Sequence, residues 1–320
     1  MTLLDVFRAR RRIAPYVRRT PLVRSWWLSD LAGADVSLKL ESVQRSNSFK
    51  SRGAFNAVIA RLERGAPALA RIVTASAGNH GRALAAAAEI FGLPLTVFTP
   101  VDAPQAKLTA ISRHGAQLRA EGRDYDEAEK LATAFARDTG AVFISPYNDA
   151  DVIAGAATVA LEIFEDAADT DALVVPIGGG GLIAGMAAVA KTISAACTVV
   201  GVEVEASCAF QTSVRAGKLV EIVPGPTLAD GLGGNPDPET ITFEPIQRLV
   251  DTIVTVSEPD LEAAVTGLVA AEHLITEGAG AAATAAIEGR RVDLSGRRVA
   301  AIVSGANIDR ERLAGLLRKA

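Results

Sequence analysis

The sequence contains few cysteines, few histidines and few aromatic residues. Cys197 and Cys208 are the two cysteines among 320 residues, and histidine occurs three times. Two cysteines so placed provide neither a disulfide framework nor the paired ligand spacing of a zinc site. The cysteine content therefore favours a reducing, cytoplasmic environment.

Long apolar runs and an excess of positive charge are also missing. Charged residues interrupt every apolar stretch before the ~20 residues that a membrane span requires, and the N-terminus has no apolar signal-peptide core. The formal net charge of −4 gives no reason to expect nucleic acid or an anionic membrane as a partner. The basic run at residues 8–12 lies in an amphipathic pattern and predicts a solvated helix face. We therefore expect a cytoplasmic protein that is neither secreted nor embedded in a membrane.

Short apolar runs of high β-propensity alternate with alanine-rich stretches of helical length. This alternation predicts α/β layering around a mainly parallel sheet. Many runs are uniformly apolar, as expected for strands that helices cover on both faces. The length suits about two domains on a prior of ~150 residues each, and we predict at least one doubly wound sheet. The runs are residues 36–40, 71–75, 95–99, 141–145, 173–177, 198–204, 252–256 and 298–303.

One lysine, Lys50, lies between a polar turn and a glycine-alanine helix start within residues 46–54. A lysine amine forms a Schiff base with a carbonyl once it is deprotonated, and burial lowers its pKa enough to allow this. Most lysines are solvated surface residues, so Lys50 alone is a weak candidate. Three further segments increase its weight.

The first is a glycine run that follows an apolar strand and precedes a helix. Gly178, Gly179, Gly180 and Gly181 leave backbone amides free to crowd an anion, and the helix start adds unpaired N–H groups. The segment therefore predicts a phosphate site. A dinucleotide fingerprint is a competing interpretation, but Glu203 is a poor match to the acidic residue expected about twenty positions on. A plain tight turn would not require four glycines in a row.

The other two segments are polar loops that also follow predicted strands. Ser76 to His80 precede an alanine-rich helix, so their backbone amides can hold a carboxylate. Ser304 closes the last strand, at the carboxyl edge where ligands bind in open α/β sheets. Taken singly, each is equally compatible with an ordinary turn. The order of lysine, asparagine loop, glycine loop and serine is the specific signal.

This ordered set resembles the β-family, or fold type II, of pyridoxal phosphate enzymes, and within it the threonine/serine dehydratases and serine racemases. The resemblance extends from residues 19–22 to Ser304. It implies a tryptophan synthase β-like architecture of two open doubly wound α/β domains with the cofactor between them. The large domain is expected at residues 1–66 and 148–320, and a small mobile domain that grips the substrate at 67–147. A homodimer is also implied.

The resemblance implies roles for individual residues of this sequence. Lys50 matches the Schiff-base lysine, which also serves as general base, and Phe49 packs beside the cofactor ring. Asn79 matches the partner of the ring hydroxyl, and Ser304 faces the pyridine nitrogen. The remaining matches are Gly178, Gly179, Gly180, Gly181 and Leu182 for the phosphate, and Ser76, Ala77, Gly78, Asn79 and His80 for the substrate. We assign no catalytic role to Arg52, Glu277 or Asp230, although they can support the site from outside.

A serine facing the pyridine nitrogen suits elimination, because a neutral partner leaves the ring a shallower electron sink than an aspartate does. The prediction is an ammonia-lyase that removes water from a β-hydroxy amino acid, threonine or serine, to give a 2-oxo acid and ammonia. A cysteine synthase-like replacement enzyme would have a different lysine segment. A non-catalytic phosphate-binding protein would use the glycine run and leave Lys50 unmodified.

The sequence departs from the family pattern at several positions. Ala77 stands where serine racemases carry a second serine, and a methyl group cannot transfer a proton, so racemisation ranks below elimination. Ala209 replaces an acidic metal ligand that would act with Glu203, so we expect no metal. Asn47 replaces a glycine, and residues 155–158 read Gly-Ala-Ala-Thr instead of Gly-Gln-Gly-Thr. These changes leave hydroxyaspartate, phenylserine or an N-substituted amino acid as alternative substrates.

The long biosynthetic threonine dehydratases append a regulatory domain after the last conserved strand. This sequence stops at Ala320, soon after Ser304. We therefore expect no feedback control through such a domain.

Overall fold

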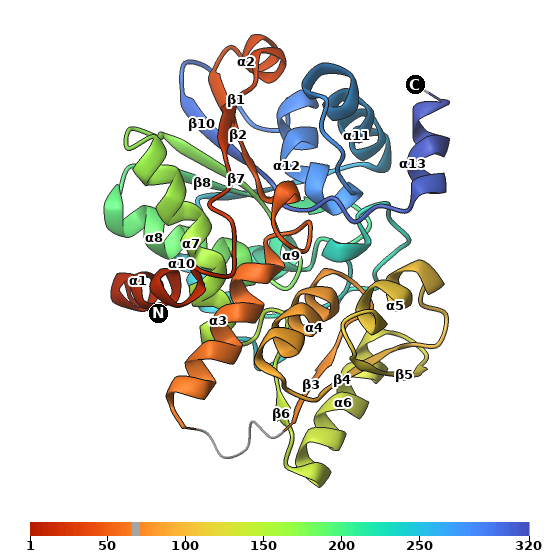
Figure 1. Cartoon of the computed structure of the whole chain (residues 1–320). Coiled ribbons are helices and arrows are strands. Elements are labelled where there is room, and N and C mark those ends of the chain that lie inside the picture. The colour runs from red at the N-terminus through yellow and green to blue at the C-terminus, as the bar shows by residue number, and fades with distance from the viewer. Residues whose placement is uncertain (66–70, 320) are drawn as a thin grey trace.

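The computed structural model describes residues 1–65 and 71–319, and its larger sheet has six strands. All neighbouring strands in this sheet are parallel except the outermost pair, β1 and β2. Figure 1 shows this sheet above a smaller one. In spatial order the six strands are β1 (Leu22–Arg24), β2 (Asp35–Leu40), β10 (Arg298–Val303), β7 (Ala172–Pro176), β8 (Thr198–Val204) and β9 (Thr252–Val256).

Helices cover both faces of the larger sheet. Leu173 and Val175 of β7 point into one apolar core, and Ala172 and Val174 point into the core on the other face. Burial on both faces explains why the strand sequence is uniformly apolar. The helices on the first face are α1 (Leu3–Ile13), α7 (Ala150–Asp166), α8 (Gly181–Ile193), α9 (Ala209–Ala216) and α10 (Phe243–Leu249). Those on the second are α2 (Trp26–Ala32), α11 (Glu258–Glu272), α12 (Gly278–Glu288) and α13 (Arg310–Leu317).

The smaller sheet has four strands, all parallel, and its strands lie between Ile72 and Phe143. Helices α3 (Lys50–Glu63), α4 (Asn79–Phe91) and α5 (Gln105–Ser112) pack in one core beside it, and α6 (Tyr125–Thr139) packs in another. Figure 1 shows α4, α5 and α6 around this sheet. Its strands in spatial order are β5 (Gln117–Gly122), β4 (Leu95–Pro100), β3 (Ile72–Ala75) and β6 (Val142–Phe143).

Helix α3 crosses α7 at closest approach where both helices carry glycine. A Cβ atom at Gly53 would lie 2.7 Å from the backbone oxygen of Val152, and one at Gly155 would collide with the backbone of Arg52. The two glycines therefore let the helix backbones touch. This contact fixes the start of α3, where Lys50 lies.

The structure confirms the predicted α/β class and its doubly wound sheets, and each of the eight predicted runs contains a strand. Two strands were missed. β1 is three residues long and exposed at the sheet edge, and β5 reads Gln-Leu-Arg-Ala-Glu-Gly with one buried residue. Edge strands do not need apolar side chains on both faces. The predicted domain boundary at 66/67 lies outside the described residues, so the division into domains stays a prediction.

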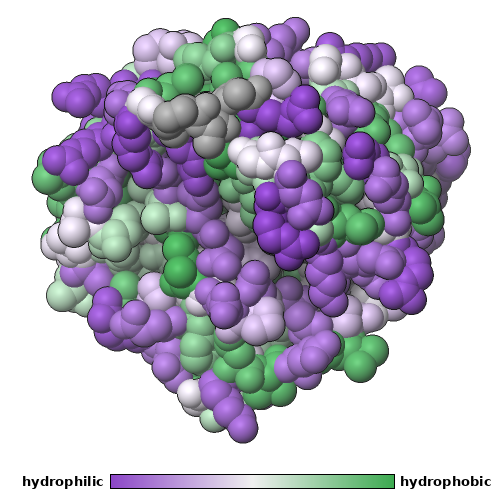
Figure 2. All heavy atoms as spheres, turned by 90° about the horizontal axis from the view of Figure 1, so that it is seen from below, coloured by the Kyte–Doolittle hydropathy of each residue, from purple (hydrophilic) through white to green (hydrophobic). Residues whose placement is uncertain are grey.

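Within residues 1–65 and 71–319, no helix is both long enough and apolar enough to cross a bilayer. Viewed from below, hydrophilic residues cover much of the surface, with hydrophobic residues scattered among them (Figure 2).

Candidate active site

Three of the predicted segments follow parallel strands at their carboxyl ends. Ser304 follows β10 and the glycine run follows β7, and these two strands are neighbours in the larger sheet. Ser76 follows β3 in the smaller sheet. Lys50 begins α3, which is reached from the end of β2 through a short 3-10 helix, η1 (Glu41–Val43). The carboxyl ends of the parallel strands therefore present these loops together.

Lys50 is a half-buried lysine at the first position of α3. Its Nζ donates to the carbonyl oxygen of Pro146 at 2.8 Å and lies 5.0 Å from the centre of the Phe49 ring. Burial of the amine lowers the pKa of Lys50 from 10.5 to about 8. A substantial fraction of the amine is therefore neutral near physiological pH, as nucleophilic and base chemistry requires.

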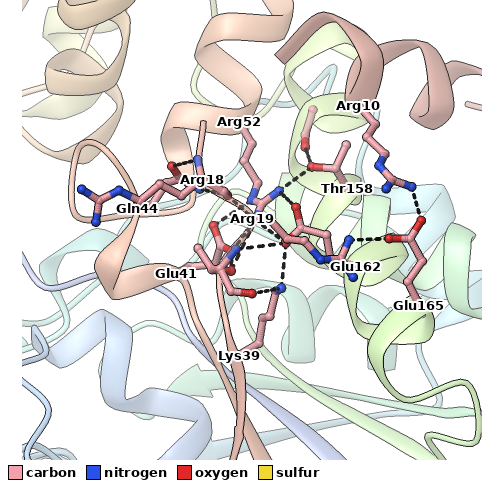
Figure 3. Close-up of polar contacts among 12 residues, drawn as sticks. Arg10, Arg18, Arg19, Lys39, Glu41, Gln44, Arg52, Thr158, Glu162 and Glu165 are labelled. Carbon is pink, nitrogen blue, oxygen red and sulfur yellow. Dashed lines mark hydrogen bonds and ion pairs between the residues drawn. The ribbon is translucent and has the colours of Figure 1, made fainter. Parts of the chain in front are cut away.

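A buried ionic network anchors the helix two residues beyond Lys50 (Figure 3). Arg52 binds Glu41 through two bonds of 2.8 Å and Glu162 through bonds of 2.7 and 2.8 Å. Lys39 donates to Glu162 at 2.7 Å and to the Thr20 carbonyl oxygen at 2.6 Å. The side chains of Lys39, Glu41, Arg52 and Glu162 are at most 7% exposed. We call these four residues the paired cluster, since each charge has an opposite partner.

The glycine run packs against Tyr147, the residue after the Pro146 that holds Lys50. A Cβ atom at Gly179 would collide with the Tyr147 ring, and one at Gly181 would lie 3.1 Å from the Tyr147 Cα atom. Gly180, the N-cap residue of α8, has a φ angle of +84° and no side chain with which to cap the first N–H groups of the helix. The run thus leaves backbone donors at a helix start beside the lysine loop.

Leu182 follows the glycine run and is 5% exposed in the core of the first sheet face. Its side chain points into that core and away from the loop. Only its backbone amide can therefore contribute to an anion site at this helix start.

Ser304 joins the lysine segment to the larger sheet. Its carbonyl oxygen accepts from the Phe49 N–H at 3.0 Å, and Ser48 pairs with Gly305 in an isolated antiparallel bridge. The Ser304 hydroxyl donates to the Ala279 carbonyl oxygen at 3.3 Å and is buried. A Cβ atom at Gly305 would collide with the Glu277 carboxylate, so a side chain there would require that carboxylate to move.

Asn79 lies at the same place, at the first position of α4. Its Nδ2 donates to Glu277 Oε1 at 2.5 Å, and its Oδ1 accepts from Asn307 Nδ2 at 2.6 Å. Glu277 is 8% exposed, and its burial raises the pKa of its carboxyl to about 7. A Cβ atom at Gly305 would lie 3.2 Å from Asn79 Nδ2, so the asparagine and serine loops are adjacent.

His80 is buried and is kept neutral. Burial lowers its pKa to about 3, and the positive charge of Lys50 adds to the shift, so the two side chains lie near each other. His80 Nε2 lies 3.2 Å from the Ile144 carbonyl oxygen, while no partner of Nδ1 occurs among the described residues. Neutral His80 cannot compete with Lys50 as a base at physiological pH.

The rest of the asparagine loop is held by the Ser76 side chain. Ser76 Oγ accepts from the Gly78 N–H at 3.2 Å, and the Ser76 N–H donates to the Phe98 carbonyl oxygen. Ser76, Ala77 and Gly78 are half-buried. No hydrogen bond joins these three residues to Lys50 directly.

Several residues that organise the site were missed. Tyr147 seals the glycine run and accepts from the Asp237 N–H at 2.9 Å. Thr242 donates to the Gly179 carbonyl oxygen at 3.0 Å. Asn307 binds Asn79, and Arg82 binds Asn307. Only Asn307, which follows the Ser304 loop, carried a local signal.

Arg52, Glu277 and Asp230, which were predicted to support the site from outside, lie in three different parts of the structure. Arg52 belongs to the paired cluster, and Glu277 contacts Asn79 directly. Asp230, in the 3-10 helix η3 (Asp230–Leu232), forms an ion pair with Lys107 of α5. That pair links a helix of the smaller sheet to a loop beside the glycine run.

Glu203, the one carboxylate matched to a metal position, binds the start of a helix in the structure. Its two oxygens accept from the backbone N–H groups of Phe210 at 2.8 Å and Gln211 at 2.7 Å, at the start of α9. Burial raises its pKa to about 7. Across residues 1–65 and 71–319, no group of three or more His, Cys, Asp or Glu side chains is placed to hold a metal.

Asn47 adopts a left-handed conformation with a φ angle of 57°. Glycine favours this conformation, and asparagine is among the few other residues that tolerate it. The Asn47 side chain also lies 3.4 Å from Asn307 Oδ1. The backbone therefore accounts for asparagine in place of the family's glycine, without reference to the substrate.

The site fits a pyridoxal phosphate group by its own chemistry. It offers a buried amine of lowered pKa, a helix start with four glycines, and two polar side chains, Asn79 after β3 and Ser304 after β10. These correspond to the aldehyde, the phosphate and the polar atoms of the ring.

Comparisons with known proteins agree with this chemistry. The pyridoxal-phosphate dependent enzyme family matches residues 13–305. An L-threonine ammonia-lyase of Thermotoga maritima is 39% identical over 323 residues, covering 100% of this chain and 79% of that protein. A catabolic L-threonine dehydratase of Staphylococcus aureus is 37% identical and covers 99% of this chain and 92% of its own length.

A solved structure of maize serine racemase has a TM-score of 0.92 at 30% identity, covering 99% of this chain and 97% of the racemase. The similarity extends over both sheets and the loops between them. The chain therefore belongs to the pyridoxal-phosphate dependent enzymes of fold type II, and pyridoxal phosphate is its cofactor.

Proposed function

We propose that this protein is an ammonia-lyase that eliminates water from L-threonine or L-serine and releases a 2-oxo acid and ammonia. The single observation that carries the proposal is the Lys50 amine, buried, lowered in pKa to about 8 and held beside the glycine run. The L-threonine ammonia-lyase and dehydratase relatives support the same reaction class.

Lys50 supplies the base in the proposed reaction. When bound, the pyridoxal group withdraws electrons from the substrate Cα and makes its proton acidic. The neutral Lys50 amine accepts that proton, and the Cα–H electrons form the Cα–Cβ double bond. The protonated Lys50 amine then returns a proton to the β-hydroxyl, which leaves as water. Water then hydrolyses the released enamine product to the 2-oxo acid and ammonia. Threonine gives 2-oxobutanoate and serine gives pyruvate.

The other residues bind and orient in this proposal. The backbone amides from Gly178 to Leu182 would hold the cofactor phosphate, and Phe49 would pack beside its ring. Asn79 would donate to the ring oxygen, while the neutral Ser304 hydroxyl would face the pyridine nitrogen. Backbone groups and Ser76 Oγ in the loop from Ser76 to His80 would hold the substrate carboxylate.

We also propose that residues 67–147 form a small domain that closes over the substrate. Helix α3 joins this segment through a shared apolar core, and support for closure comes from the contacts to the loops of the larger sheet, which are polar. They include the Lys107–Asp230 ion pair, the Asn79–Glu277 bond and the Arg82–Asn307 bond. Polar contacts of this kind can break and re-form during closure at low cost.

A cytoplasmic homodimer is the remaining part of the proposal. The two cysteines are free, as expected in a reducing compartment. The homodimer rests on the family resemblance. Size-exclusion chromatography with light scattering would test the oligomeric state.

Racemisation is the second candidate, because the fold closely matches a serine racemase. Inversion requires an acid on the substrate face opposite Lys50. Ala77, in the loop that would hold the substrate, carries only a methyl group at the relevant position. Elimination is therefore the favoured reaction.

The test is a panel of β-hydroxy amino acids, with 2-oxo acid and ammonia release measured and each recovered substrate examined for inversion. The panel includes L-threonine, L-serine, hydroxyaspartate and phenylserine. We expect oxo acid from threonine or serine with wild-type protein and none with Lys50→Ala. Inverted amino acid with little oxo acid would contradict the proposal.

A further inference from the structure

Asn307 lies where three separate loops of the site meet. It follows the Ser304 loop, and its Nδ2 donates to the Ser46 carbonyl oxygen at 2.9 Å and to Asn79 Oδ1 at 2.6 Å. Its Oδ1 accepts from Arg82 Nη1 at 2.5 Å. The side chain therefore joins the lysine loop, the asparagine loop and α4.

The hydrogen-bond chemistry of these partners leaves one orientation for the Asn307 amide. A guanidinium has donors only, so the atom of Asn307 that faces Arg82 must be the oxygen. The Asn307 nitrogen then faces Ser46 and Asn79, and the Ser46 carbonyl oxygen can only accept. The Arg82 contact and the Ser46 contact indicate the same orientation of the Asn307 amide, so this orientation does not depend on how the Asn79 amide is placed.

This fixed amide determines the orientation of the next one. Asn307 presents an N–H group to Asn79, so the Asn79 atom that faces it must be Oδ1. The Asn79 Nδ2 group is thereby directed to the opposite side, toward Glu277 and Gly305. Arg82, Asn307 and Asn79 form a chain in which one donor-only residue sets the direction of two amides.

We propose that Asn307, oriented by Arg82, is a positioning residue that makes Asn79 present an N–H group to the ring oxygen of the cofactor. The inference rests on the proposed function, in which Asn79 contacts that oxygen. An oxygen bound to an aromatic ring accepts hydrogen bonds when it is ionised. An Asn79 amide turned the other way would place two oxygens face to face and weaken cofactor binding.

Asn307→Asp tests this with almost no change of shape, because the carboxylate keeps the acceptor for Arg82 and loses the donor to Asn79. We expect apo protein carrying this change to bind pyridoxal phosphate about tenfold more weakly, as expected for one lost hydrogen bond near 1.4 kcal/mol. The absorbance maximum of the bound cofactor should also shift, because its ring oxygen loses a donor. A residue that only tethers loops would not move that maximum.

Asn56→Asp is the matched control. Asn56 is buried, its Oδ1 accepts from Arg12, and its Nδ2 donates to the Asp151 carbonyl oxygen at 2.7 Å, so it has the same kinds of partners away from Asn79. We expect a similar or larger fall in melting temperature for this variant, with cofactor affinity and absorbance unchanged.

Arg82→Met provides a second variant in case Asn307→Asp fails to fold. It removes the donor that orients Asn307 while Asn307 keeps its own N–H groups, so affinity should fall a few-fold and the absorbance should shift in the same direction. Wild-type affinity and absorbance in either folded variant would overturn the inference and leave the proposed function intact. Failure of the wild-type protein to bind pyridoxal phosphate would overturn both.

Discussion

Lys50 and Arg52 lie two residues apart on α3 and belong to two buried polar clusters in which burial has different outcomes. In the paired cluster, burial opposes the charge of Arg52, but Glu41 and Glu162 outweigh it and raise its pKa, while Arg52 and Lys39 lower the pKa of Glu162. Arg52 and Glu162 are therefore held in their charged forms. Four compensated charges provide rigidity at the base of α3 and no reactive group.

The second group, Lys50, Asn79, His80 and Glu277, we call the unpaired cluster. Burial lowers the pKa of Lys50 and of His80 and raises that of Glu277. All three shifts favour the neutral form, because burial removes hydration, and the charge of Lys107 near Glu277 does not outweigh that loss. Shifts of this kind are typical of functional sites. The comparison indicates that pairing, and not burial, separates structural ionic groups from reactive ones.

The largest effect is expected from Lys50→Ala. Loss of the proposed base should lower the rate of 2-oxo acid release by about 10²–10⁴-fold or more. The melting temperature of the apo protein should stay the same or rise, since an uncompensated amine has been removed. Lys191→Ala is the control, because Lys191 binds the Cys197 carbonyl oxygen and Asp251 elsewhere. Activity that survives in Lys50→Ala would remove Lys50 from the mechanism.

Lys50→Ala should lower activity and not stability, whereas Arg52→Met should mainly lower stability. It leaves the Glu41 and Glu162 carboxylates buried, with Lys39 bonded to Glu162, so the free energy of unfolding should fall by about 3–5 kcal/mol. Chemical denaturation measures this. Arg248→Met, at an exposed Arg–Glu pair on α10, should change the same quantity by less than about 1 kcal/mol. Equal losses in the two variants would show that the paired cluster contributes no more than a surface ion pair.

Glu277→Gln sharpens the comparison through pH. The folded-state pKa of Glu277, about 7, lies above its ordinary value of 4.5, so the folded protein holds the proton more tightly. This contribution to stability is complete below pH 4.5 and is lost as the pH rises through about 7. Apo Glu277→Gln should therefore gain roughly 2–3 kcal/mol relative to wild type between pH 5 and pH 8.

The stability of Glu277→Gln must be compared with that of wild type at each pH, because Glu203 and Glu129 also have pKa values raised to about 7 by burial. Those two carboxyls titrate in both proteins and cancel in the comparison. A difference in melting temperature that does not change with pH would mean that Glu277 is charged in the folded protein at both pH values.

The smallest effect is expected at Asn47. Its left-handed backbone predicts that Asn47→Ala lowers the free energy of unfolding by about 1 kcal/mol, while Asn47→Gly changes it by less than about 0.5 kcal/mol. Substrate preference should be the same in wild type and Asn47→Gly. A changed preference among β-hydroxy amino acids would instead mean that the Asn47 side chain contacts the substrate.

Much of the fold could be predicted because its strands are buried on both faces. Runs such as Val199 to Val202 are apolar throughout, since helices cover both sides of the sheet. The β5 strand could not be predicted in this way, because only one of its six residues is buried. Edge position is a property of the assembled sheet and leaves little local pattern.

The site also combines features that have a local sequence pattern with features that arise only in the folded chain. Lys50 and the glycine run have local signatures, because helix starts and glycine conformation are local physics. Tyr147 and Asn307 act on residues far away in the sequence, and the Asn307–Asn79 bond spans 228 positions. Arg52 was weighed as support for the site, but its pairing with Glu162 depends on the crossing of α3 and α7. Long-range contacts of this kind have no signal within the segment itself.

The most direct test of the comparison locates the cofactor on the chain. The holoprotein is reduced with borohydride and digested, and mass spectrometry identifies the lysine that carries the pyridoxyl group. The account predicts modification of Lys50, the uncompensated amine, and no modification of Lys39, whose charge Glu162 holds at 2.7 Å. A pyridoxyl group on Lys39 or Lys107, with Lys50 unmodified, would contradict it.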